Sequence, residues 1–125
     1  MVILGVDYGS VKVGLAIAAG LVAAPLRVVP AQDARFLREE LRRAIVEYDV
    51  GMVVVGMPKE DRERVEAFVA WLRRELTQPV VVEDEQLTTQ FAKRLMRGWK
   101  GKAEDDAIAA ALIAQTYIER SAEGM

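Results

Sequence analysis

Short runs of apolar residues, many of them β-branched, open the chain and predict three β-strands. The runs cover Val2–Asp7, Val13–Ala19 and Val22–Val29. Gly20 divides the second run from the third, and Pro30 closes the third. Because the connections between the runs are short, we expect the three strands to pair antiparallel as a meander.

The spacing of the apolar positions then changes. From Asp33, an expected N-cap, to Tyr48, apolar residues recur every three or four positions among charged ones, which predicts an amphipathic helix. The apolar run Gly51–Gly56 predicts a strand covered on both faces. The next apolar stripe predicts a second helix, with Val65, Phe68, Val69, Leu72 and Leu76 buried. A strand over Pro79–Val82 follows. The remaining pattern predicts a helix that is capped by Thr88 or Thr89 and runs to Met96, and a last helix over about Glu104–Arg120.

These elements predict a single α/β domain over residues 1–125. Strand–helix–strand units pair their strands in parallel through right-handed crossovers, whereas the opening meander is antiparallel. The expected fold is therefore a mixed five-stranded sheet with helices on both faces. Ligands of such sheets collect at the carboxyl ends of strands, where Asp7 and the acidic triplet Glu83–Glu85 are expected.

Composition narrows the chemistry that this domain is able to perform. The chain has no Cys and no His, which excludes thiolate nucleophiles, Cys/His zinc sites and imidazole acid–base catalysis. The net charge of −2 provides no overall positive field for nucleic acid or an acidic membrane, so any such contact is local. The uncharged stretch Val13–Leu26 is shorter than the roughly 20 residues of a spanning helix. We expect no membrane contact and, as the default, a cytoplasmic location.

Three acidic positions stand out by their context. Asp7 follows a buried strand, Asp84 or Glu85 follows another, and Asp105 or Asp106 begins an apolar helix. Each position has an ordinary explanation: binding turn amides, solvating a strand end, or complementing the positive end of a helix. Together, however, they suggest a cluster of carboxylates.

Converging carboxylates suit hard divalent cations. Mg²⁺ and Mn²⁺ prefer oxygen ligands, and two such ions about 3.5–4 Å apart activate a water and stabilise the leaving oxygen of a phosphodiester without a side-chain base. Only part of the acidic triplet faces such ions, because alternation along a strand sends Glu83 and Glu85 to one side and Asp84 to the other. We therefore favour Glu85 as a ligand, with Asp84 as the alternate.

Four segments, in order and over almost the whole chain, resemble the YqgF/RuvX family. They are Ile3–Ser10 with Val13–Ala16, Val54–Pro58, Asp84–Thr89 and Asp106–Ile113. The family is ribonuclease H-like and is described as Holliday junction resolvases and as nucleases that mature the 5′ end of 16S ribosomal RNA. The resemblance implies these activities here, with Asp7, Glu85 and Asp106 as the catalytic, metal-binding acids and Asp105 as the alternate to Asp106.

The chain departs from the family pattern at three places. Gln86 stands where the family usually has Arg, which removes a cation able to contact phosphate. After Pro58 the family's polar, glycine-containing loop is largely absent, and Lys59–Arg62 leads directly into the helix. Ser10 replaces the commoner Thr and keeps the hydroxyl. The first two departures predict altered activity and a lost substrate contact.

Positive charge gathers in one segment. Residues 86–103 contain no acid but five Lys or Arg residues and Trp99, which leaves 12 basic residues against 19 acidic ones elsewhere. We expect the cations to bind phosphates and Trp99 to stack on an unpaired base or to wedge at a branch. The competing interpretation is a solvated helix face on which Trp99 packs as a lid. The expected nucleic-acid contacts are Ser10, Lys12, Arg94, Arg97, Trp99, Lys100 and Lys102.

The first functional hypothesis is an endonuclease that uses two divalent cations, Mg²⁺ or Mn²⁺, to cleave structured RNA or branched DNA. The alternative is a non-catalytic nucleic-acid-binding or ribosome-assembly factor that retains the fold, which the change at Gln86 and the short loop favour. A third hypothesis takes the turn Asp7–Ser10 as the phosphate-binding hairpin of a sugar-kinase or actin-like ATPase. The length argues against it, because those proteins need two such domains and an adenosine-binding segment, which 125 residues cannot supply. A symmetric substrate such as a four-way junction needs two cuts, which favours a homodimer.

Overall fold

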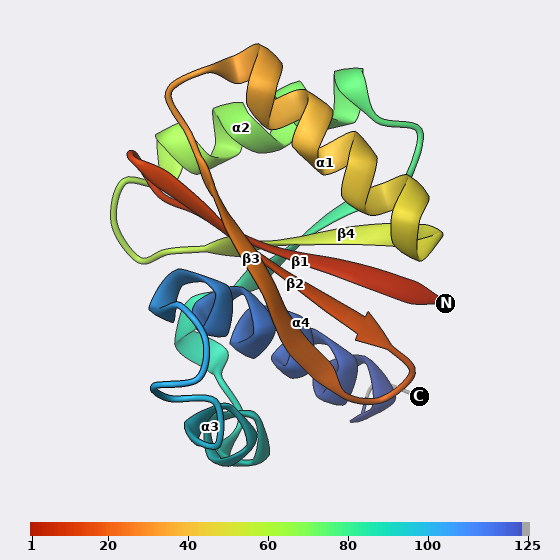
Figure 1. The fold of residues 1–125 in the computed structure, drawn as a ribbon. Coiled ribbons are helices and arrows are strands. Elements are labelled where there is room, and N and C mark those ends of the chain that lie inside the picture. Colours follow the sequence, from red (N-terminus) through yellow and green to blue (C-terminus); the bar gives the residue numbers. More distant parts are fainter. Residues whose placement is uncertain (124–125) are drawn as a thin grey trace.

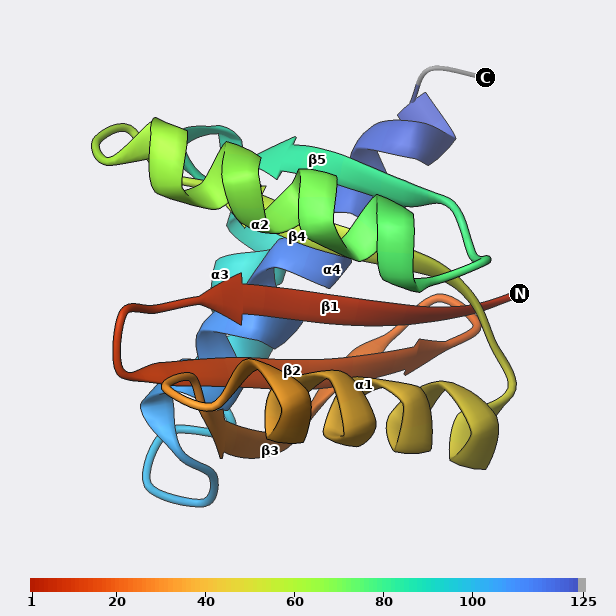
Figure 2. The same cartoon turned by 90° about the horizontal axis from the view of Figure 1, so that it is seen from above.

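The computed structural model describes residues 1–123, in which a five-stranded sheet lies between two pairs of helices (Figure 1). The strands lie in the order β3-β2-β1-β4-β5. Helices α1 and α2 cover one face, α4 covers the other, and α3 packs against α4 on that side (Figure 1 and Figure 2). The elements in chain order are β1 Val2–Tyr8, β2 Lys12–Ala19, β3 Ala23–Pro30, α1 Ala34–Tyr48, β4 Val50–Met57, α2 Arg62–Glu75, β5 Val80–Asp84, the 3₁₀ helix η1 Glu85–Leu87, α3 Gln90–Arg97 and α4 Asp105–Glu123.

Strand pairing confirms the predicted mixed sheet. β1 pairs antiparallel with β2, and β2 pairs antiparallel with β3, which forms the expected meander. β4 then pairs in parallel with both β1 and β5, and α2 provides the crossover between β4 and β5. The carboxyl ends of β1, β4 and β5 therefore lie side by side at one edge of the sheet.

Side chains alternate across the sheet and build one apolar layer on each face. Leu4 and Val6 of β1 belong to the layer under α1 and α2, together with Leu41 and Leu72. Ile3 belongs to the opposite layer, under α3 and α4, which is built largely from alanine. Because alanine side chains are short, α4 lies close to the sheet, and this close packing determines where the amino-terminal end of α4 lies.

Local capping signals are confirmed at two helices. The Asp33 side chain accepts hydrogen bonds from the amides of Arg35 and Phe36 at 3.0 and 3.1 Å, as an N-cap does. Of the two candidate caps for α3, the structure has Thr89, whose hydroxyl accepts the Ala92 amide at 3.1 Å.

Two helix boundaries differ from their predictions. Leu76 lies just beyond the end of α2 at Glu75, because the backbone there is already extended, but its side chain still packs on the same core. The last helix continues to Glu123, past the predicted end at Arg120, since no glycine or proline interrupts the sequence there. Within residues 1–123, no helix is sufficiently long and apolar to cross a membrane.

Candidate active site

Asp7 and Glu85 meet at the carboxyl edge of the sheet. Asp7 is the penultimate residue of β1, and Glu85 begins η1 directly after β5. β4 lies between these strands, and its Gly56 presents no side chain: a Cβ there would lie 2.6 Å from Glu85 Oε1. Because Gly56 has no side chain, the Glu85 side chain is able to extend across β4. There it comes within hydrogen-bonding distance of the Asp7 side chain.

This contact changes how both acids hold protons. Burial is the largest cause that raises the pKa of Glu85 to about 7, and the charge of Asp7, the hydrogen bond to Asp7 and the charge of Asp84 act in the same direction. Burial and the charge of Asp106 raise the pKa of Asp7, while the hydrogen bond to Glu85 partly offsets that rise. The proximity of the two carboxyl groups thus favours a proton on Glu85 over one on Asp7.

Asp106 lies near this pair, in the first turn of α4. Its Oδ2 is 3.9 Å from the Lys12 Nζ of β2, and both side chains are partly exposed to solvent. The start of α4 is held directly against β2, because a Cβ at Gly14 would lie only 1.9 Å from the Asp106 carbonyl oxygen. Close packing on a glycine therefore places Asp106 at the same edge as Asp7.

The three predicted acids lie at the same edge of the sheet, but they do not converge on a common position for a metal ion. Within residues 1–123, no group of three or more His, Cys, Asp or Glu side chains lies close enough together to hold a metal ion. Asp7 and Glu85 are in contact, whereas Asp106 acts on Asp7 through its charge and pairs with Lys12. The arrangement is a two-carboxylate site with a third acid beside it.

The alternate acids have other surroundings. Asp84 caps η1, with its Oδ1 accepting the Gln86 amide at 2.8 Å. Glu83 is buried and pairs with Arg120 of α4 at 2.9 Å, while Asp105 is exposed and lines a groove beside α3. The structure therefore brings Glu85, rather than Asp84, to Asp7.

Arg64 of α2 is a cation at this site that the sequence analysis missed. Its Nη2 donates to the Tyr8 carbonyl oxygen at 3.2 Å, and its Nε pairs with the Asp61 carboxylate at 2.6 Å. Its charge partly offsets the rise in the pKa of Asp7. The i, i+3 pair Asp61 and Arg64 is visible in the sequence, but the sequence does not reveal that the short connection after Pro58 starts α2 beside the end of β1.

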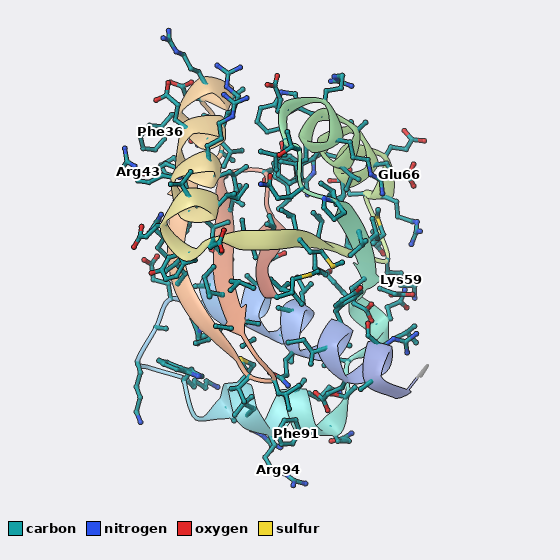
Figure 3. All side chains as sticks on the ribbon, turned by 90° about the vertical axis from the view of Figure 1, so that its right-hand side faces the viewer. Phe36, Arg43, Lys59, Glu66, Phe91 and Arg94 are labelled. Carbon is teal, nitrogen blue, oxygen red and sulfur yellow. The ribbon has the colours of Figure 1, made fainter. Side chains whose placement is uncertain are left out.

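The predicted nucleic-acid contacts fall into two groups. Ser10 and Lys12 lie at the β1–β2 turn, next to the acids. The others lie on α3 and the loop that follows it, where Figure 3 shows Arg94 and the exposed Phe91 projecting outward from α3. Trp99 is half-buried and packs on the apolar layer under α4, which agrees with its interpretation as a lid. Lys12 pairs with Asp106. The five cations of α3 and the following loop form no ion pair within residues 1–123: Lys93, Arg94, Arg97, Lys100 and Lys102.

Sequence comparison relates the whole chain to a known family. The model of a family described as "RuvX: Holliday junction resolvase" matches residues 1–120. A Thermoanaerobacter pseudethanolicus protein named "Putative pre-16S rRNA nuclease" is 32% identical over 134 residues, covering 95% of this chain and 96% of its own. A protein of the same name from Streptococcus suis is 37% identical over 139 residues, covering 97% and 99%.

Structural comparison finds the same fold in two resolvases. The RuvC of T. thermophilus, solved in complex with a Holliday junction substrate, superimposes with a TM-score of 0.71 at 18% identity and covers 99% of this chain and 96% of its own. The Holliday junction resolvase of fowlpox virus gives a TM-score of 0.60 at 12% identity, covering 97% and 99%. At these identities, the likeness establishes the fold alone.

Proposed function

This chain belongs to the RuvX family, and from that premise we propose that it is a divalent-metal-dependent endonuclease that hydrolyses phosphodiesters in structured nucleic acid. The observation that carries the proposal is the Asp7–Glu85 pair at the carboxyl edge of the sheet. Two carboxyl groups pressed together beside a third acid resist ionisation, and a cation relieves that repulsion. The site therefore has the electrostatics of a cation site.

The donor chemistry fits Mg²⁺ or Mn²⁺. All three candidate ligands, Asp7, Glu85 and Asp106, are carboxylates, and both ions prefer oxygen donors. Asp7, Glu85 and Asp106 would hold the two ions that we propose. When bound, the ions activate water as the nucleophile and stabilise the charge that develops on the leaving oxygen.

Cations of the chain flank these acids. Lys12 pairs with Asp106 and is partly exposed, so it is available to a phosphate that enters the site. Arg64 neutralises part of the negative charge at Asp7 and is held in place by Asp61 and the Tyr8 carbonyl. Both residues favour binding of an anionic backbone next to carboxylates that would otherwise repel it.

The proposed substrates are the 5′ end of precursor 16S rRNA and the four-way DNA junction. The relatives' names support precursor 16S rRNA as a substrate, and the family description supports the junction. The proposed contacts beyond the acids are Ser10, Arg94, Arg97, Trp99, Lys100 and Lys102. The proposal places the protein in the cytoplasm. It also includes a homodimer, because a symmetric junction requires two cuts.

Cleavage of labelled substrates tests this function. A 16S precursor fragment and a four-way junction are incubated with Mn²⁺, Mg²⁺ or EDTA, with wild type compared to Asp7→Asn. We expect specific cuts that disappear with EDTA and fall by at least about 100-fold in the variant, because a metal-binding acid is lost. The exposed Glu66→Gln of α2 should cleave as wild type does.

The alternative function predicts a different result. A non-catalytic factor would bind both substrates without metal-dependent cleavage, as the change at Gln86 and the short connection after Pro58 suggest. Equal activity of Asp7→Asn and wild type would also refute the site itself.

A further inference from the structure

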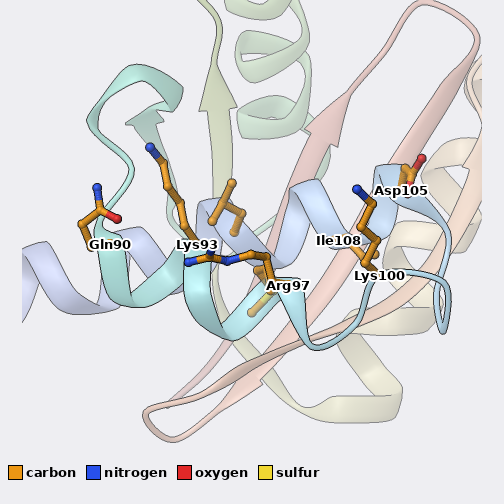
Figure 4. Close-up of a pocket in the computed structure, with 8 residues that line it drawn as sticks. Gln90, Lys93, Arg97, Lys100, Asp105 and Ile108 are labelled. Carbon is orange, nitrogen blue, oxygen red and sulfur yellow. The ribbon is translucent and has the colours of Figure 1, made fainter.

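A groove runs between α3 and α4, next to the acidic edge. It has a volume of about 450 Å³, within the about 300–1,000 Å³ range of ligand pockets. Figure 4 shows its lining, with Lys93 and Arg97 from α3 and Lys100 from the following loop. Asp105 lines the groove as well and is the neighbour of Asp106 along α4. One end of the groove therefore lies at the amino-terminal end of α4, the end that carries Asp106.

The cations of this groove have no acidic partner. Lys93, Arg97 and Lys100 form no ion pair with any acid in residues 1–123. By contrast, the arginines on the far side of the sheet are largely matched with acids, as Arg35 is with Glu39 on α1. Because only one acid, Asp105, lines the groove, its local charge is positive although the chain is acidic overall.

Apolar side chains complete the groove. Met96 of α3 and Ile108 and Leu112 of α4 line it between the cations. Met96 is almost fully buried, and the two α4 residues are half-exposed. The groove thus combines an apolar surface with separate positive charges at its sides.

This combination matches one chemical class of ligand. An unpaired nucleotide has a flat, weakly polar base and a charged phosphate, which suit the apolar surface and the cations respectively. In a duplex, the base faces are stacked on one another and are not available to such a surface. A purely electrostatic contact with a duplex would not require the apolar lining.

We propose that the groove between α3 and α4 binds an unpaired segment of the nucleic acid, with Lys93, Arg97 and Lys100 on its phosphates and the half-exposed Ile108 and Leu112 against its bases. The proposal rests on the nuclease function and deepens it. It means that a single-stranded stretch next to the cleaved bond is part of what the protein recognises.

The test measures binding by fluorescence anisotropy with EDTA present, so that no cleavage occurs. The probes are labelled oligouridine and oligothymidine of about 10 nucleotides and a blunt RNA duplex of about 16 base pairs. We expect Lys93→Gln/Arg97→Gln to weaken oligonucleotide binding about tenfold at low salt and to reduce the slope of log affinity against log salt by about 1.4, about 0.7 for each lost phosphate contact.

A second variant tests the apolar surface independently of charge. Ile108→Thr keeps the branched shape and should weaken single-strand binding about threefold at every salt concentration, without changing the slope. The control is Arg43→Gln/Arg74→Gln, which removes two exposed cations from α1 and α2 on the far face, one of them, Arg43, paired with Glu40. The control should bind as wild type does, and circular dichroism should show all variants to be folded.

Wild-type binding by both groove variants would overturn the proposal, as would an equal loss for duplex and single strands. In the latter case, the groove is a general electrostatic surface. The two hypotheses fail separately. If the wild type shows no metal-dependent cleavage but the groove variants bind less tightly, the nuclease function is refuted. If the wild type cleaves and the groove variants bind as it does, the role of the groove in binding is refuted.

Discussion

The Glu85 carboxyl holds its proton because of where its side chain lies. It is partly buried, touches Asp7 and has the charge of Asp84 close by, and its pKa rises from 4.5 to about 7. An unpaired glutamate in water has lost its proton well below neutral pH. The folded protein therefore carries a titration in the neutral range although the chain has no histidine.

This shift predicts how stability depends on pH in the absence of divalent cations. Between pH 4.5 and about 7 the folded protein binds more protons at Glu85 than the unfolded chain does. The free energy of unfolding should therefore fall as pH rises through that window, by about 1–2 kcal/mol once solvent screening is allowed for. Urea unfolding in EDTA at about pH 5 and about pH 8 measures this change.

Substitution separates Glu85 from other titrating groups. Glu85→Gln removes the ionisable group, so this component of the pH dependence should vanish and the variant should be more stable than wild type at about pH 8. Glu66→Gln, on the exposed side of α2, should retain the wild-type profile. An unchanged pH profile in Glu85→Gln would contradict the assignment of the shift to this carboxyl.

At the scale of elements, the position of α4 decides where Asp106 lies. The helix approaches β2 so closely at Gly14 that a Cβ would lie 1.9 Å from a backbone oxygen, that of Asp106. A backbone atom, unlike the end of a flexible side chain, cannot turn away. Glycine is therefore required at this point for the start of α4 to reach the acidic edge.

Gly14→Ala should consequently push α4 away from β2. We expect a loss of about 3 kcal/mol or more of stability, since overpacking against rigid backbone lies at the upper end of such costs. The control is Gly98→Ala at the end of α3, where φ is −65° and a Cβ would lie 3.4 Å from its nearest neighbour. Urea unfolding compares the two, and similar stabilities would show that α4 is not held by close packing at Gly14.

At the scale of the whole molecule, strand β1, the 3₁₀ helix η1 that follows β5, and helix α4 each contribute one acid to the same edge. Ionising these acids costs free energy in the absence of a cation, because they are partly buried and repel one another, as the raised pKa values of Asp7 and Glu85 indicate. A ligand that binds only the folded chain stabilises it by mass action. Metal binding should therefore be measurable as stability, independently of cleavage.

Saturating Mg²⁺ or Mn²⁺ should raise the melting temperature of the wild type at about pH 8, and EDTA should reverse the rise. At about 100 times the dissociation constant, the gain is about 2.7 kcal/mol. Asp7→Asn should lose most of this gain, whereas Glu66→Gln should keep it. Calorimetry provides the measurement, and equal stabilisation of both variants would place the ion elsewhere.

Much of the architecture followed from local patterns in the sequence. The periodicity of apolar residues located all five strands and the four α-helices, because side chains alternate along a strand and recur every three or four residues along a helix. Asp33 and Thr89 are caps whose hydrogen bonds reach only two or three residues along the chain. The sequence also placed Asp7 at the end of a buried strand. Such features depend on neighbours in the chain, so the sequence determines them by itself.

The contacts of the site were decided only by the tertiary structure. Glu85 reaches Asp7 across a third strand, which depends on the sheet order and on the bare surface at Gly56. Arg64 joins the site because α2 starts beside β1, and the groove exists because α3 packs along α4. Each contact joins residues far apart in the sequence, and its geometry is set by how closely whole elements pack. Local periodicity contains no information about that distance, which is why the sequence predicted a cluster of acids but not that Glu85 meets Asp7 or that Arg64 joins them.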